Sequence, residues 1–214
     1  MKSLVAKIGG SLWRSPLLER WIAALGAWPG PLSIVPGGGP FADAVRAAQG
    51  SMRFSDRAAH EMALLAMEQY GLALCDLFGG LALAATPREA AAVRAQGRTP
   101  VWRPRALALE AGLPASWDLT SDSLAAWYAR ESGAPELLLI KSVDAGCPSD
   151  AASLVDPRFF DYARELSVFL LGPKNLETAE AHLPSGALPW KRAEISTPRH
   201  AEFASAQKAL GVGD

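Results

Sequence analysis

The sequence predicts an α/β fold in which a mainly parallel sheet carries helices on both faces. Short apolar segments of strand length alternate with longer segments whose apolar residues recur at helical spacing. Because this order places a helix between successive strands, it favours parallel pairing. The chain has 214 residues, of which 50% are hydrophobic and 20% charged, so we expect a well-buried core and one domain spanning residues 1–214.

The first elements are indicated by apolar runs and by the residues that end them. Residues 4–8 form a short apolar strand that stops at a glycine pair, and apolar residues recur at helical spacing over residues 17–25, after Pro16. A second strand is expected at residues 32–35, where a proline and three glycines end it. A helix is then expected over residues 41–49.

The longest helical pattern covers residues 55–77. Ser55 can cap it, and apolar side chains share one broad face until Gly79 and Gly80 end the helix. The elements expected after it are a strand at 81–85, a helix at 87–96, a strand at 99–102, a loop containing Pro114, a helix at 124–131, a strand at 136–141, a helix at 159–164, a strand at 167–171, a helix at 175–182 and one possible strand at 193–196. This order keeps the alternation of strands and helices.

The net charge indicates which classes of binding partner are not expected for this protein, and the cysteine content indicates in which cellular compartment it works. The formal net charge is −1, which favours neither nucleic acid nor an anionic membrane as the main partner. The apolar runs at 137–140 and 168–171 are too short to span a bilayer, and the first residues turn polar and glycine-rich at once, unlike a signal peptide. Cys75 and Cys147 are too few for a disulfide framework and lack metal-ligand spacing. We therefore expect a cytoplasmic protein with reduced cysteines.

Two of the expected strands end in glycine-rich turns, at residues 7–11 and 37–39. Ligands of parallel α/β sheets bind at the carboxyl ends of the strands, and glycine lets backbone amides approach a phosphate closely. Lys7 could reach a transferring phosphoryl group from the first turn. One such turn alone is better explained as a tight turn, but two of them, each directly after a strand, favour phosphate binding. Neither is a Walker A loop or a G-x-G-x-x-G dinucleotide motif.

A third candidate element is Thr120-Ser121-Asp122-Ser123, at the start of an expected helix. An acidic side chain there can orient lysines or hold a magnesium ion. The same residues also suit a plain helix cap, in which Ser or Asp accepts backbone N–H bonds. Taken alone, the segment favours the cap.

Four segments together resemble the amino acid kinase superfamily, which includes acetylglutamate, uridylate, carbamate and isopentenyl phosphate kinases. They are residues 7–11, 36–39, 120–126 and 141–146. Their order and spacing fit the pattern of the superfamily over about two thirds of the chain. Residues 54–56, 60–63 and 66–71 are most similar to one branch, the aminomethyl-furan-methyl phosphate kinases of methanofuran and methylofuran biosynthesis. Enzymes of that branch convert a furan-methyl phosphate to its diphosphate.

The resemblance implies a three-layer α/β/α sandwich that uses ATP and Mg²⁺. It implies an acceptor site in the N-terminal part, a nucleotide site in the C-terminal part, no metal ligand from the protein, and a homo-oligomer. The residues that it assigns are Lys7 and Asp122 for catalysis, Gly9, Gly10, Gly37, Gly38, Gly39, Arg53 and His60 for the acceptor, and Ser11, Lys141, Asp144 and Gly146 for the nucleotide. Arg53 and His60 are equally compatible with the surface of a helix.

The chain departs from the superfamily pattern after the nucleotide loop. Many members carry a Gly-Gly-Met-x-x-Lys segment whose lysine supports the transferring phosphate, but here the chain runs through residues 156–160 without it. Arg158 and Lys174 are candidate replacements for that charge. The loop at 144–147 also departs from the usual Val-Asp-Gly. A nucleoside monophosphate kinase and a non-catalytic nucleotide-binding protein on the same fold therefore stay open as alternatives.

Overall fold

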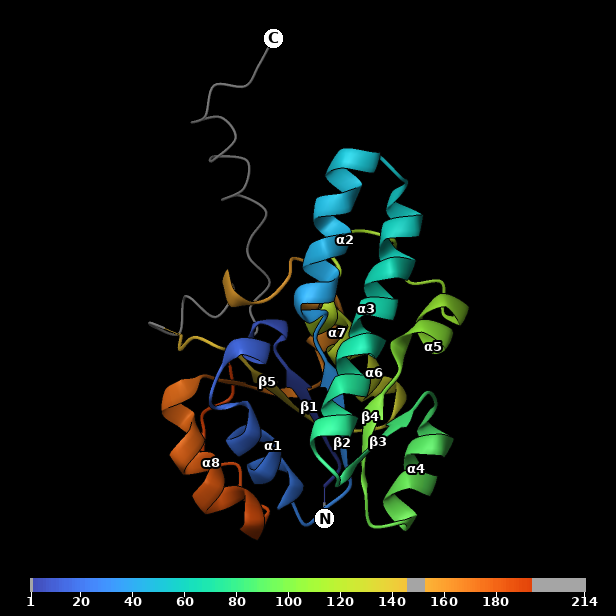
Figure 1. Cartoon of the computed structure of the whole chain (residues 1–214). Helices are drawn as coiled ribbons and strands as arrows, with labels where there is room; N and C mark the ends of the chain where they lie inside the picture. The colour runs from blue at the N-terminus through green and yellow to red at the C-terminus, as the bar shows by residue number, and fades with distance from the viewer. Residues whose placement is uncertain (1, 146–152, 194–214) are drawn as a thin grey trace.

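The computed structural model describes residues 2–145 and 153–193 (Figure 1). The strands are β1 Leu4–Ile8, β2 Leu32–Pro36, β3 Leu81–Ala84, β4 Thr99–Trp102, β5 Glu136–Ile140 and β6 Ser167–Leu171. The helices are α1 Leu18–Gly26, α2 Gly39–Met52, α3 Asp56–Leu77, α4 Pro87–Ala95, α5 Pro104–Glu110, α6 Ser121–Glu131, α7 Phe159–Ala163 and α8 Leu176–His182. Short 3-10 turns cover Gly10–Arg14, Pro173–Asn175 and Leu183–Ser185.

The six strands form one parallel sheet in the order β3-β4-β2-β1-β5-β6. β1 therefore lies at the centre, between β2 and β5. Because all strands point the same way, the residues that follow β1, β2 and β5 meet at one edge of the sheet. This edge brings the two glycine turns and Lys141 together.

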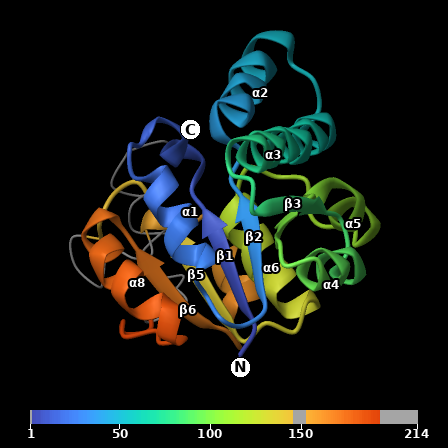
Figure 2. The same ribbon diagram turned by 60° about the horizontal axis from the view of Figure 1, so that its bottom comes forward.

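Helices cover both faces of the sheet, as Figure 2 shows from below. On one face, Leu4, Ala6 and Ile8 of β1 pack with a core that includes α1 and α8. On the other face, Val5 packs with a core that includes α6 and α7. The alternation follows from the pleat of a strand, which points successive side chains to opposite faces. The predicted three-layer α/β/α sandwich is confirmed.

The helices α2 and α3 form a hairpin that rises beyond the carboxyl edge of the sheet (Figure 1). The Ser55 hydroxyl caps α3 as predicted, since it accepts a hydrogen bond from the Ala58 N–H at 3.3 Å. At the tip, Arg53 adopts the left-handed conformation with φ 59°, and its N–H donates to the Gln49 carbonyl at 2.8 Å. Arg53 therefore closes the end of α2 and turns the chain into α3.

One difference from the predicted elements has a physical origin in the tertiary structure. Helix α5 forms in a stretch predicted as loop, where Pro104 starts the helix and the Arg105 side chain pairs with Glu61 of α3. The predicted strand at 193–196 lies outside the described residues apart from Ala193, whose N–H donates to the Val168 carbonyl at 2.8 Å. Within the described parts of the chain, none of the helices combines the length and apolarity that crossing a bilayer requires.

Candidate active site

Two lysines and one aspartate form an ion cluster at the carboxyl edge of the sheet. Lys7 Nζ lies 2.8 Å from Oδ1 of Asp122, and Lys141 Nζ donates to Oδ2 at 2.6 Å. The strand register explains why the lysines converge: Lys7 is opposite Leu139 of β5, so Lys141, two residues further on, faces the same side of the sheet. Helix α6 begins on that side and carries Asp122 in its first turn.

The cluster is buried and its charges depend on one another. The side chains of Lys7 and Asp122 are 5% and 8% exposed. Burial alone would raise the pKa of Asp122, but the neighbouring Lys7 and Lys141 ammonium groups lower it below its usual value. Burial and the charge of Lys7 lower the pKa of Lys141 to about 8, against the opposing effect of Asp122. Asp122 is therefore a carboxylate at neutral pH, and its two oxygens each face an ammonium group.

A second carboxylate, Asp156, holds the start of α6 in place. It accepts hydrogen bonds from the N–H groups of Thr120 and Ser123, each at 3.0 Å, and from both hydroxyls, with the Thr120 bond at 2.8 Å. Asp156 thus caps the helix from a segment 33 residues away from Ser123. The sequence predicts a cap from within residues 120–123 and gives no indication of Asp156, because a cap supplied across the fold has no local signal.

The two glycine turns pack backbone against backbone. A Cβ at Gly10 would lie 2.6 Å from the Gly39 nitrogen, so a larger residue cannot fit there without moving the second turn. The Gly9 N–H donates to the Ile140 carbonyl at 2.9 Å, and the Gly37 N–H donates to the Ile8 carbonyl at 2.8 Å. These two amides are committed to the sheet, which corrects their predicted role as phosphate donors.

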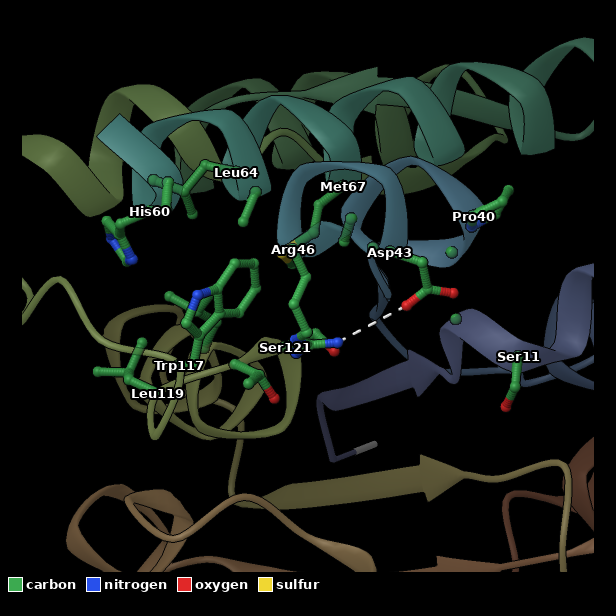
Figure 3. A pocket seen from close by; sticks show the side chains of 18 of the residues that line it. Ser11, Pro40, Asp43, Arg46, His60, Leu64, Met67, Trp117, Leu119 and Ser121 are labelled. Atoms are coloured by element: carbon green, nitrogen blue, oxygen red, sulfur yellow. Dashed lines mark ion pairs between the residues drawn. The ribbon is translucent and has the colours of Figure 1, made fainter. Parts of the chain in front are cut away.

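A cavity of about 630 Å³ opens beside these turns (Figure 3). Its walls come from the 3-10 turn after β1, the start of α2, the first half of α3 and the loop before α6. Of the residues predicted for the acceptor, Gly10, Gly38, Gly39 and His60 line it, whereas Gly9, Gly37 and Arg53 do not. Ser11, which was predicted for the nucleotide, lines the same cavity. The volume suits a small-molecule ligand.

Aromatic and charged side chains that the sequence analysis did not assign also line the cavity. The Arg46 guanidinium lies 4.3 Å from the centre of the Trp117 ring, and Trp117 Nε1 donates to the Gln49 side-chain oxygen at 2.7 Å. Asp43 pairs with Arg46 at 3.7 Å, as Figure 3 shows. Trp13, from the 3-10 turn after β1, is also at the wall. Arg46 and Trp117 meet only in the folded protein, because they are far apart in the chain.

His60 is the one side chain of the α3 start that combines burial with a free polar atom. It is 8% exposed, and its Nε2 has no hydrogen-bond partner within the described structure. Burial lowers the pKa of His60, so its imidazole is neutral at pH 7. A neutral imidazole beside the cavity can exchange a hydrogen bond with a ligand.

The remaining predicted residues lie elsewhere. Arg53 is exposed at the tip of the α2–α3 hairpin and does not line the cavity. Asp144 accepts a hydrogen bond from the Lys174 N–H at 3.0 Å, which ties the end of β5 to the turn after β6. Gly146 lies outside the described residues. Ser11, by contrast, is at the cavity wall, and its hydroxyl is 2.7 Å from that of Ser142.

The two candidate replacements for the missing lysine do not reach the ion cluster. Arg158 forms an ion pair with Asp161 at 2.8 Å, at the start of α7. Lys174 is exposed after β6. Within the described residues, Lys141 is the lysine that shares Asp122 with Lys7.

Comparison with known proteins agrees with this architecture. The uridylate kinase from Archaeoglobus fulgidus has a TM-score of 0.58 and 15% identity, over 85% of this chain and 96% of that one. The UMP kinase from Ureaplasma parvum has a TM-score of 0.57 and 15% identity, over 81% of this chain and 90% of that one. No curated protein matches the sequence. Because the model of the amino acid kinase family matches residues 2–145, this chain belongs to the amino acid kinase family of phosphotransferases.

Proposed function

We propose that this chain transfers the terminal phosphoryl group of ATP to a small anionic acceptor held in the cavity. The observation that carries this proposal is the buried Lys7–Asp122 pair, which does not itself line the cavity but has near sequence neighbours that do. Gly10 follows Lys7 by three residues and Ser121 directly precedes Asp122, and both line the cavity. A fixed ammonium group at this position is suited to neutralising charge on a transferring phosphoryl group.

The residues of the site suit ATP, and Mg²⁺ would arrive with its phosphates. Lysine ammonium groups and a glycine turn at strand ends are the donor set that a triphosphate requires. Both Asp122 oxygens face lysines, and the described segments contain no group of three His, Cys, Asp or Glu side chains that could hold a metal ion. When bound, Mg²⁺ would supply charge neutralisation between the phosphates.

The chemical step needs no covalent intermediate with the protein. An anionic oxygen of the acceptor forms a bond to the γ-phosphorus, the bond from that phosphorus to the β–γ bridging oxygen breaks, and ADP leaves with the electron pair. A phosphate or carboxylate acceptor is already deprotonated, so no general base is required. The residues of the chain position the acceptor, exclude water and neutralise charge.

The acceptor that we propose is [5-(aminomethyl)furan-3-yl]methyl phosphate, which would become its diphosphate. This molecule combines a flat ring, an anion and an ammonium group. The cavity offers matching partners in the Trp117 ring, the Arg46 guanidinium and the Asp43 and Asp56 carboxylates. The resemblance of residues 54–56, 60–63 and 66–71 to the furan-phosphate branch supports the same choice.

A nucleoside monophosphate such as UMP is the second candidate acceptor. The likeness of the fold to two uridylate kinases favours it, and an aromatic wall can stack on a pyrimidine as well as on a furan. The test offers the full chain MgATP with each acceptor and measures ADP together with the mass of the product. Acceptor-dependent ADP supports the kinase, and the preferred product identifies the acceptor. Tight ATP binding without acceptor-dependent ADP would instead indicate a non-catalytic nucleotide-binding protein.

His60→Ala is expected to raise the Michaelis constant of the acceptor about tenfold while leaving that of ATP unchanged. The reason is that the variant removes one hydrogen-bonding group from the acceptor cavity, worth about 1 kcal/mol or somewhat more. Steady-state kinetics with each substrate varied in turn would measure both constants. His182→Ala, an exposed histidine at the end of α8, is the control. A change in the ATP constant alone would show that the cavity binds the nucleotide.

We also propose that the protein is a homo-oligomer that associates through α3. The solvent side of this helix exposes Met62, Leu65, Leu72 and Leu77, with Leu72 58% and Leu77 68% exposed. Apolar side chains aligned on one face of a helix are typical of a subunit interface. Sedimentation equilibrium should give more than one subunit, and Leu72→Glu should lower that number. A wild-type chain that sediments only as a monomer would disprove this proposal.

A further inference from the structure

The ion cluster holds more positive than negative charge. Lys7 and Lys141 face the two oxygens of the same carboxylate, at 2.8 Å from Oδ1 and 2.6 Å from Oδ2 of Asp122. This trio therefore carries one positive charge in excess in a buried site. An excess buried charge is unfavourable until an anion compensates it. The cluster is thus prepared for an anionic ligand.

The nearby carboxylate of Asp156 does not take the place of that anion. Its oxygens accept four hydrogen bonds from Thr120 and Ser123 at the start of α6. Lys7 from β1, Asp122 from α6 and Asp156 from the segment before α7 are the charged groups that influence Lys141. Of these, only Asp122 contacts its ammonium group.

The backbone at Lys141 is tied to the neighbouring strands on both sides. Its N–H donates to the Leu171 carbonyl of β6 at 2.8 Å, and the carbonyl before it accepts from the Gly9 N–H at 2.9 Å. Its neighbour Ser142 contacts Ser11 of the first glycine turn. The Lys141 side chain is 12% exposed, against 5% for Lys7, so it is the more accessible of the two lysines. A lysine whose backbone is tied in this way and whose ammonium group is held by Asp122 can support a reacting group with little reorganisation.

We infer that Lys141 is a catalytic residue, whose ammonium group contacts the transferring phosphoryl oxygens from the side opposite Lys7. The inference rests on the proposed kinase function and assigns Lys141 to the reaction centre, beyond the predicted role in nucleotide binding. Asp122 holds the two ammonium groups apart, and both keep their protons during the transfer. Lys141 thereby supplies the positive charge that neither Arg158 nor Lys174 brings to the cluster.

The test compares Lys141→Met and Lys141→Arg with the wild-type chain, with the exposed Lys191→Met as control. We expect Lys141→Met to lower kcat about 10²–10³-fold, as for loss of one electrostatic contact to a transition state, with the Michaelis constants within about threefold. The kcat of Lys141→Arg should be at least tenfold higher than that of Lys141→Met. The wild-type kcat/KM for ATP should fall as the pH rises through about 8, where the Lys141 ammonium loses its proton. In Lys141→Arg this fall should move to higher pH.

A binding measurement tests the inference without an acceptor. Calorimetry with MgADP and aluminium fluoride, which mimics the transferring phosphoryl group, should show about 10²-fold weaker binding to Lys141→Met than to wild type, while MgADP alone binds both equally. Loss of MgADP affinity with unchanged kcat would overturn the inference in favour of nucleotide binding. A Lys141→Met variant with the kcat of the wild type would also overturn the inference. So would a folded Lys141→Arg variant whose kcat is as low as that of Lys141→Met. If the wild type turns over no acceptor and fluoride adds nothing to MgADP binding, the proposed function itself fails.

Discussion

Lys7→Met is expected to lower kcat about 10²–10³-fold or more while the protein stays folded. The Lys7 ammonium is buried against Asp122 beside the first glycine turn, where it can neutralise charge on the transferring phosphoryl group. The fold should survive because Lys141 still pairs with Asp122, so no carboxylate is left alone. Methionine keeps the length of the side chain and removes only its charge.

The measurement is the rate of acceptor-dependent ADP release, with circular dichroism to confirm folding. Lys2→Met is a matched control, because Lys2 lies just before the same strand and is 66% exposed in its pair with Glu136. It should leave turnover within about twofold, since Lys2 lies at the N-terminal end of β1, away from the carboxyl edge of the sheet, although the buried Glu136 carboxylate loses its partner. A folded Lys7→Met variant with near-normal turnover would exclude Lys7 from the reaction.

Asp122→Asn is expected to impair both stability and turnover. The substitution leaves two buried ammonium groups without a carboxylate, and breaking a buried ion pair from one side costs about 3–5 kcal/mol of unfolding free energy. Turnover should fall because the two lysines lose the group that positions them. Urea unfolding at pH 7 would measure the loss of stability.

The pH dependence separates this effect from a general packing defect. The lysines lower the pKa of Asp122 in the folded state, so its contribution is present above the unfolded pKa of about 3.9 and is lost as the pH falls through the lower folded value. Asp122→Asn lacks this contribution at every pH, so the difference between wild type and variant should narrow in acid. Asp161→Asn, which breaks the exposed pair with Arg158, should lower the free energy of unfolding by less than about 1 kcal/mol. Equal losses in both variants would contradict the assigned role of Asp122.

The secondary structure was largely predictable because local patterns determine it. All six strands of the described chain were expected, since short apolar runs between glycine and proline leave few alternatives. Helix α3 was predicted almost to the residue from Ser55 and its apolar face. Helix α5 was missed because its apolar pattern is short and its link to α3 through Arg105 and Glu61 joins distant residues.

The sequence by itself determined the alternation of strands and helices, the two glycine turns and the candidate Lys7, because these depend on neighbouring residues. Asp122 became a catalytic candidate only through the resemblance of several segments to a family. Only the tertiary structure decided which groups meet. The parallel register of β1 and β5 places Lys141 on the same carboxylate as Lys7, and Asp156 reaches α6 from a later segment. The fold also commits the Gly9 and Gly37 amides to the sheet and leaves Arg53 outside the cavity. Strand order and register follow from packing across the whole domain, so no local pattern specifies these contacts.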